Sequence, residues 1–441
     1  MKDEPKKKKS KLPKIILAVV AVIIIAIIGV ALRYMSAFNG FLDKITNRKP
    51  EMKQYSVIVM NDSGLNEVGD LKNKNASFLR TDVKANNAKQ YLQDQVEVGV
   101  NFYDDMSMMV DMLKNRVTDT IVLETDRMEA LKEESEDFAN STKVIYTFEI
   151  ELESESIEVP EKEITEEPFI VYISGSDSRT GIKTTARSDV NIVVVVNPKQ
   201  SKILLASIPR DTYVQLHDTV GLKDKLTHAG IYGINMSKTT IEDFLGISID
   251  YTIKVSFETV VKVVDELDGI DIESDKEMSL KAEGKDKRCN YVVGVQHVDG
   301  DCALRFARER KSYKTGDIHR GENQQQVITS IIGRLSKSKD YLLKIPTILD
   351  IAGDSFETTI PRDNILAFIR MQLTDSIDWK VESVGVSGEG VLEPTYSMGN
   401  NTPLYVMLPD EESVQNVKNK IVEYMIGEEI KEEEEQEASD F

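Results

Sequence analysis

The sequence predicts an α/β protein with two folded units. The chain has 441 residues, about three times the length of a typical domain. Apolar strand-like runs alternate with segments of helical spacing, first over residues 55–150 and again over residues 169–426. A stretch with eight Glu and two Pro at residues 151–168 separates the two series and is typical of an acidic linker.

An uninterrupted apolar run of eighteen residues, 15–32, predicts one transmembrane helix. At about 1.5 Å per residue it is long enough to cross a hydrocarbon core of about 30 Å. Residues 1–14 carry seven Lys, so the positive-inside rule places this basic segment in the cytoplasm and the rest of the chain outside. A cleaved signal peptide is the alternative, but its apolar region is usually shorter. We expect a single-pass protein of the cell membrane with its large C-terminal part outside the cell.

The composition excludes several classes of function. Acids outnumber bases 75 to 55 and the formal net charge is −20, which argues against a nucleic-acid binder. Four scattered His and two Cys argue against a zinc site. Cys289 and Cys302 lie in the exported part, where they form either a disulfide or two free buried thiols. The chain has no glycine-rich phosphate loop of the Walker type.

The segment 55–150 predicts a small accessory α/β unit. Strands are expected at 55–60, 119–124 and 143–150, and helices at 85–95 and 105–116. Its role stays open between packing, docking of a partner and binding of a solute.

The segment 169–426 predicts a larger α/β unit. Near-continuous apolar runs at 169–175, 191–197 and 202–209 are typical of central strands that are covered on both faces. Helices are expected at 238–245, 257–267, 322–336, 341–350, 362–372 and 410–426. Residues 427–441 contain eight acids and one Lys, which predicts a solvated acidic tail.

Charged side chains gather where the central strands of the larger unit end. Asp177 and Asp189 flank the loop between the first two strands, and Arg210 follows the third. Ligands of open α/β sheets bind outside the carboxyl ends of the strands. Two facing carboxylates repel each other unless a proton or cation lies between them, and Mg²⁺ accepts one or two protein carboxylates. Turn-forming or helix-capping Asp residues are an equally good explanation of this spacing alone.

A second charged segment contains four Arg within sixteen residues: Arg305, Arg308, Arg310 and Arg320. A planar guanidinium binds phosphate oxygens with two hydrogen bonds, which Lys cannot imitate. A charge run is usually only a solvated face, and the backbone conformation of 305–310 decides which of these Arg share a face. In combination with the aspartates, however, the segment predicts a site for a doubly phosphorylated ligand held by a metal.

Several motifs resemble the LytR-CpsA-Psr (LCP) family. They are DSR and RSD within 177–189, SIPRDTYV at 207–214, DKLTHAGIYG at 224–233, IDYTIKVSFETVVKVVDELDGIDI at 249–272, ALRFARER at 303–310 and GDIHRGENQQQV at 316–327. The resemblance covers about residues 169–426 and implies a three-layer α/β/α catalytic domain with an apolar tunnel for a prenyl chain. It implies a phosphotransferase that moves a glycopolymer phosphate, from teichoic acid, capsule or another wall polymer, from a polyprenyl-pyrophosphate carrier to peptidoglycan.

The resemblance also implies roles for individual residues. Asp177 and Asp189 would hold Mg²⁺, or alternatively Mn²⁺, and would act in catalysis together with Arg210. The pyrophosphate would be bound by Arg187, Arg210, Lys225, Arg308, Arg310, Arg320 and Gln324. One departure concerns Asn323, which stands where many relatives carry Arg.

Two other functions stay open at the level of sequence. The same site could pass the phosphate to water, as in a polyprenyl-pyrophosphate hydrolase. A membrane-tethered sensor or regulator of the envelope could instead bind a lipid or a solute without catalysis.

Overall fold

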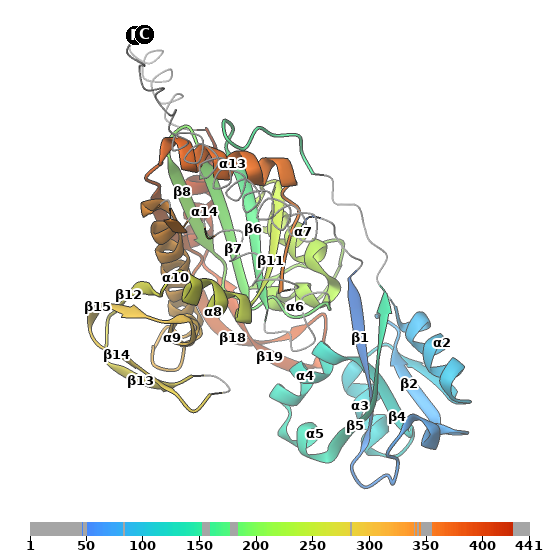
Figure 1. Ribbon diagram of the computed structural model, residues 1–441. Coiled ribbons are helices and arrows are strands. Elements are labelled where there is room, and N and C mark those ends of the chain that lie inside the picture. The colour runs from blue at the N-terminus through green and yellow to red at the C-terminus, as the bar shows by residue number, and fades with distance from the viewer. Residues whose placement is uncertain are drawn as a thin grey trace, which may run out of the picture.

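The computed structural model describes residue 46 and residues 51–426, except for 83, 152–158, 177–183, 283–284, 339, 342–343 and 345–354. The predicted cytoplasmic segment 1–14, transmembrane helix 15–32 and tail 427–441 lie outside this part, as does most of the helix expected at 341–350. No helix within the described part is long and apolar enough to span a bilayer. Figure 1 shows a smaller unit, coloured blue to cyan, beside a larger unit.

The smaller unit is built on a five-stranded sheet with the order β3-β2-β4-β1-β5. Strand β1 is antiparallel to β4 and β5, whereas β2 is parallel to β3 and β4. The elements are β1 (Met52–Met60), η1 (Val68–Leu71), β2 (Asn75–Leu79), α2 (Ala85–Gln95), β3 (Gly99–Tyr103), α3 (Met106–Lys114), β4 (Thr120–Glu124), α4 (Thr125–Glu134), α5 (Glu136–Ser141) and β5 (Thr142–Glu151). The sequence pattern indicated β1, α2, α3, β4 and β5 but missed β2, β3, α4 and α5.

The larger unit is built on a six-stranded mixed sheet with the order β16-β11-β6-β7-β8-β17 (Figure 1). Its strands are β6 (Phe169–Ser176), β7 (Val190–Asn197), β8 (Lys202–Ser207), β11 (Tyr251–Ser256), β16 (Phe356–Thr358) and β17 (Lys380–Gly385). Its helices are α6 (Leu226–Ala229), η2 (Gly230–Tyr232), α7 (Ile234–Leu245), α8 (Phe257–Glu266), α9 (Gly300–Ala307), α10 (Asp317–Lys337), α13 (Arg362–Asp375) and α14 (Glu411–Ile426).

Helices cover both faces of this sheet, which explains the continuous apolar strands. Alternate residues of a strand point to opposite faces. Tyr172 and Val193 pack on one face with residues of α7 and α14, whereas Val171 and Ile192 pack on the other face with residues of α10 and α13. The chain is thus a mixed α/β protein, as predicted from the sequence.

The strand directions bring five strand ends to one edge of the sheet. Strand β6 is antiparallel to β7 and parallel to β11, and β8 is antiparallel to β7 and parallel to β17. The register pairs Gly175 with Val190 and Ser207 with Gly385. The carboxyl ends of β6, β8, β11 and β17 therefore meet at the start of β7, and the loops that leave this edge carry the predicted site residues.

Four two-stranded ribbons complete the larger unit. They are β9 (Tyr213–Val214) with β10 (Asp224–Lys225), β12 (Ile270–Ser274) with β15 (Gly294–Val298), β13 (Met278–Lys281) with β14 (Arg288–Tyr291), and β18 (Gly388–Thr395) with β19 (Gly399–Pro409). A disulfide between Cys289 and Cys302 joins β14 to α9, with 5.3 Å between the Cα atoms.

The β18–β19 ribbon of the larger unit packs against the smaller unit. Met398, in the turn of the ribbon, and Leu404, in β19, are buried in the apolar cluster that contains Met109 and Leu113 of α3. Beside this contact, buried Arg127 of α4 donates a hydrogen bond of 2.8 Å to the hydroxyl of Tyr232. An apolar contact and a polar contact thus hold the two units together.

We expect Leu404→Ala to lower the free energy of unfolding by about 2–4 kcal/mol, because the side chain is 1% exposed and its removal leaves a cavity at the junction. Leu392→Ala in the same ribbon is the matched control. Leu392 is 69% exposed, so its truncation should change stability by less than about 0.5 kcal/mol. Denaturant unfolding of both variants measures the difference, and equal effects would contradict the burial of Leu404 at this junction.

Candidate active site

A cavity of about 980 Å³ lies between the two units, at the edge of the six-stranded sheet where the strand ends meet. Every predicted site residue within the described part of the chain lines it: Arg187, Asp189, Arg210, Lys225, Arg308, Arg310, Arg320 and Gln324. Asp177, the other predicted metal ligand, lies outside the described residues. The structure therefore brings together side chains that are up to 137 positions apart, from Arg187 to Gln324.

The conformation of the loop before β7 places the side chains of both Arg187 and Asp189 at the cavity. Between them, Ser188 is buried and its hydroxyl lies 3.0 Å from the hydroxyl of Tyr172. Its backbone N–H donates to the carbonyl of Thr227 at 3.0 Å. A side chain at Gly230 would collide with the backbone of this loop, so only glycine permits the close approach.

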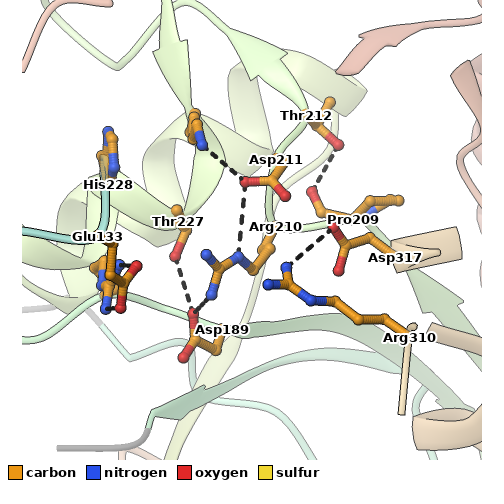
Figure 2. A network of polar contacts seen from close by, with 12 residues as sticks. Glu133, Asp189, Pro209, Arg210, Asp211, Thr212, Thr227, His228, Arg310 and Asp317 are labelled. Carbon is orange, nitrogen blue, oxygen red and sulfur yellow. Dashed lines mark hydrogen bonds and ion pairs between the residues drawn. The ribbon is translucent and has the colours of Figure 1, made fainter. Parts of the chain in front are cut away.

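Arg210 lies between two carboxylates at the end of β8. Its Nη1 donates to Asp189 Oδ1 at 2.6 Å, and its Nε lies 3.6 Å from Asp211 Oδ1 (Figure 2). Burial alone would lower the pKa of Arg210, but the adjacent Asp189 and Asp211 carboxylates raise it above its ordinary value. The guanidinium therefore stays positively charged in a partly buried site.

Two further groups of ion pairs lie beside Arg210, one around Asp211 and one at the start of α10. Asp211 lies 3.3 Å from Lys225 Nζ. Burial tends to raise the pKa of Asp211, but Lys225 and Arg210 outweigh it and hold that pKa at about 2. Asp317 is 3.8 Å from Arg310 (Figure 2) and 2.9 Å from Arg320, which lies one turn further along α10. The predicted phosphate-binding cations are thus positioned by carboxylates, of which Asp317 had no expected role from the sequence.

The backbone of the arginine-rich segment changes direction within the motif. Helix α9 ends at Ala307, Arg308 follows as its C-cap, and Arg310 lies in the turn beyond it. The guanidinium of Arg308 lies over the ring of Phe257, 4.6 Å from the ring centre. Arg305 pairs instead with Glu309 along the helix. Neither an extended strand nor a continuous helix describes residues 305–310.

Two residues of the glutamine-rich motif have structural contacts away from the cavity. Buried Asn323 donates to the carbonyl of Phe306 at 3.1 Å, and buried Gln325 donates to the carbonyl of Leu205 at 2.8 Å. Asn323 therefore holds α10 against α9. Gln324 lies between these two and lines the cavity.

A buried Asp-His-Ser group beside the site lacks the geometry of a catalytic triad. Nδ1 of His228 lies 2.7 Å from Asp224 Oδ1 and 2.8 Å from Ser397 Oγ. A triad needs the acid and the nucleophile on different ring nitrogens. All three side chains are also buried, which favours a structural role at the turn of the β18–β19 ribbon.

The smaller unit forms the opposite wall of the cavity, which the sequence analysis did not anticipate. Helix α4 contributes four carboxylates, those of Asp126, Glu129, Glu133 and Glu134. The only pattern that could have indicated this helix is the pair Met128 and Leu131, three positions apart and both buried. Nothing in the sequence places α4 beside motifs that begin more than fifty residues later.

The two walls of the cavity differ in charge. Among the described lining residues, the larger unit supplies nine Lys and Arg and four carboxylates, whereas the smaller unit supplies four carboxylates and no cation. A wall with nine cations against four carboxylates, within a chain of net charge −20, favours a polyanionic ligand on that side of the cavity. The arrangement suits binding of phosphate groups and stabilisation of negative charge that moves between them.

Asp189 fits the role of a Mg²⁺ ligand in its position and chemistry. Its side chain is 15% exposed and lines the cavity among the cations that are predicted to bind phosphate. Within the described residues no cluster of three or more His, Cys, Asp or Glu could enclose a metal ion. Mg²⁺ does not require such a cluster, because it takes one or two carboxylates and completes its shell with water and phosphate oxygens.

The LytR_cpsA_psr family model matches residues 122–423, about two thirds of the chain. The chain therefore belongs to the LytR-CpsA-Psr family, as its motifs predicted, and the match includes helix α4.

Two curated relatives share the motif-bearing region. One is the polyisoprenyl-teichoic acid–peptidoglycan teichoic acid transferase TagV of Bacillus subtilis, to which the chain is 31% identical over 266 residues. This aligned region covers 60% of this chain and 66% of TagV. The other is the corresponding transferase TagU of Halalkalibacterium halodurans, to which the chain is 30% identical over 249 residues. This aligned region covers 56% of this chain and 76% of TagU. The crystal structure of B. subtilis TagV matches with a TM-score of 0.50 and 29% identity, over 59% of this chain and 98% of that one.

Asp126 makes the stability of the protein depend on pH. Burial raises its pKa to about 7; Arg187 opposes this shift, and the Glu124 and Asp189 carboxylates add to it. The folded chain therefore holds this proton more tightly than the unfolded chain, whose Asp has a pKa of about 4. Through this group, stability falls as the pH rises from about 4 to about 7.

We expect Asp126→Asn to stabilise the protein more at pH 7.5 than at pH 4.5, with a difference of at least about 1 kcal/mol, because Asn keeps the neutral form at every pH. Denaturant unfolding at both values measures the gain. Glu129→Gln, on an exposed position of the same helix, is the control. A gain from Asp126→Asn that does not grow with pH would contradict the raised pKa.

Proposed function

We propose that the chain is a phosphotransferase of the bacterial cell envelope that transfers a teichoic acid or related glycopolymer phosphate from a polyprenyl-pyrophosphate carrier to peptidoglycan. The observation that carries this proposal is the basic wall of the cavity, in which eight predicted site residues converge. The names of TagV and TagU, which are teichoic acid transferases that use a polyisoprenyl carrier and peptidoglycan, support it.

The proposal includes the position of the protein at the membrane. A single N-terminal transmembrane helix at 15–32 would tether a three-layer α/β/α catalytic unit on the outer side, with residues 1–14 in the cytoplasm. The lipid carrier and the wall acceptor meet on that side. A tethered enzyme would therefore find its two substrates within reach of one site.

In this reaction the Arg and Lys side chains bind the pyrophosphate and offset its charge. Without them, the negative pyrophosphate would repel the attacking oxygen. A hydroxyl group of peptidoglycan attacks the phosphorus that bears the glycan, the P–O bond to the second phosphate breaks, and polyprenyl phosphate leaves. Negative charge moves to the leaving phosphate, where guanidinium groups held in place by Asp189, Asp211 and Asp317 stabilise it.

Mg²⁺, or alternatively Mn²⁺, would be held by Asp189 together with Asp177 and by phosphate oxygens of the substrate. When bound, the metal supplies additional positive charge beside the pyrophosphate. A carboxylate, Asp177 or Asp189, can also assist as the base that accepts the proton of the attacking hydroxyl, although ligation to a metal weakens it in this role.

We expect Arg210→Ala to lower the rate of glycopolymer transfer at least about 100-fold, because Arg210 lies at the centre of the cation network and stabilises charge in the transition state. The assay combines the full chain in detergent, a polyprenyl-pyrophosphate-linked glycan, peptidoglycan oligomers and Mg²⁺. Arg334→Ala is the control, because Arg334 lies on α10 and bonds to the carbonyls of Leu267 and Asp268 outside the cavity.

The same assay separates the alternatives. Normal transfer by the Arg210→Ala variant would remove Arg210 from the site. Release of free glycan phosphate without transfer would instead indicate the hydrolase, and binding of the lipid without any turnover would indicate the sensor.

Removal of divalent cations tests the cofactor. We expect EDTA to abolish transfer, and an excess of Mg²⁺ or Mn²⁺ to restore it, because both ions accept carboxylate and phosphate oxygens. Asp189→Asn should raise the concentration of Mg²⁺ required for half-maximal rate. Full activity in EDTA would exclude the metal from the reaction.

A further inference from the structure

Helix α4 places two glutamates of the smaller unit against two cations of the predicted pyrophosphate site. Both carboxylate oxygens of Glu133 accept hydrogen bonds from Arg187, at 2.7 Å from Nη1 and 2.9 Å from Nη2 (Figure 2 shows Glu133 beside the network). The neighbouring Glu134 lies 3.8 Å from Lys225 Nζ. Two consecutive side chains thus reach two cations that the proposed function assigns to the substrate.

The Glu133–Arg187 contact has the geometry that a phosphate would have. Two parallel N–H···O bonds from one guanidinium are the usual arrangement with a carboxylate and with a phosphate alike. Glu133 is also surrounded by positive charges that are predicted to bind a phosphate. Its hydrogen bond to Arg187 lowers its pKa, and the positive charges of Arg187, Arg210 and Arg310 contribute in the same direction. The carboxylate is therefore ionised at neutral pH and lies in the field of three predicted substrate ligands.

The local sequence does not favour glutamates at this position. Glu133 and Glu134 are the last two residues of α4, where the negative end of the helix dipole disfavours carboxylates. Partners outside the helix must therefore stabilise them. Arg127 of the same helix is buried and bonded to Tyr232 of the larger unit, which fixes α4 beside the cavity.

We propose that Glu133 is an internal competitor of the substrate: its carboxylate occupies on Arg187 the place of a pyrophosphate oxygen, and substrate binds only when Glu133 leaves. This inference rests on the proposed function, which assigns Arg187 to the pyrophosphate. The Glu133 side chain is 57% exposed, whereas that of Arg187 is 18% exposed. Glu133 can therefore rotate into solvent while Arg187 stays in place, so the release requires no movement of α4. The accessory unit in this way sets the affinity of the site for its substrate.

The test is the affinity of the full chain, in detergent with Mg²⁺, for inorganic pyrophosphate, measured by isothermal titration calorimetry. We expect Glu133→Gln to bind about 3- to 10-fold more tightly than the wild type, because it removes a charged competitor held by a partly exposed ion pair. Glu129→Gln is the matched control. It removes the same charge from the same wall of the cavity, but Glu129 pairs with Lys132 of its own helix. Its affinity should stay within about twofold of the wild type.

A second pair of variants separates competition from a general change in charge. In an Arg187→Ala background, Glu133→Gln should bring no further gain, because the contact for which the two anions compete is gone. Equal gains with and without Arg187 would overturn the inference.

The outcomes also distinguish this inference from the proposed function. If Glu133→Gln binds pyrophosphate as the wild type does, or more weakly, while the wild type transfers glycopolymer, the inference is wrong and the function stands. Weaker binding would indicate that Glu133 orients Arg187 for substrate. Tighter binding by Glu133→Gln with no transfer by any variant supports the competitor and contradicts the transferase. Absence of pyrophosphate binding in all variants overturns the inference and the role of Arg187 in the site.

Discussion

Mutual repulsion of clustered cations is the constraint on which the rest of this structure depends. Nine Lys and Arg line one wall of a cavity of about 980 Å³. Such groups cannot be partly buried together unless carboxylates lie between them, because the repulsion grows as water is excluded. Asp189 and Asp211 flank Arg210, and Asp317 lies between Arg310 and Arg320. This alternation of positive and negative side chains keeps the cations charged and holds them in place, directed toward the cavity.

The mixed sheet provides the frame that this alternation requires. Because β7 is antiparallel to β6 and β8, while β11 runs parallel to β6 and β17 runs parallel to β8, five strand ends meet at one edge. Apolar side chains on both faces fix the strands between helices, so the loops at that edge have little freedom. Ser188, which lies between Arg187 and Asp189, is an example of this restriction. The hydrogen bonds of its hydroxyl and its backbone N–H hold it in the interior, so that Arg187 and Asp189 face the cavity.

The sequence predicted those parts of the structure that local patterns determine. Apolar runs indicated the central strands, and the motifs around Asp189, Arg210 and Arg308 indicated the charged wall. The sequence analysis missed the other wall, because α4 has only a short apolar pattern and meets the site through contacts with residues far along the chain, such as Tyr232. The role of Asp317 could not be predicted either, since the position of an Asp near an Arg in sequence does not reveal which cation it will face in the fold.

The same electrostatic constraint explains why an acidic wall can accompany a phosphate site. A basic cavity without ligand needs negative charge to remain folded, and a bound pyrophosphate supplies that charge itself. Asp211, with an exposed fraction of 3%, is a permanent partner of the cations, because its removal would leave them uncompensated. Glu133 is largely exposed and can return to water, where its charge is well solvated. In the proposed exchange a phosphate oxygen would replace this carboxylate on Arg187, so Arg187 would stay paired and the accessory unit would not block the bound substrate.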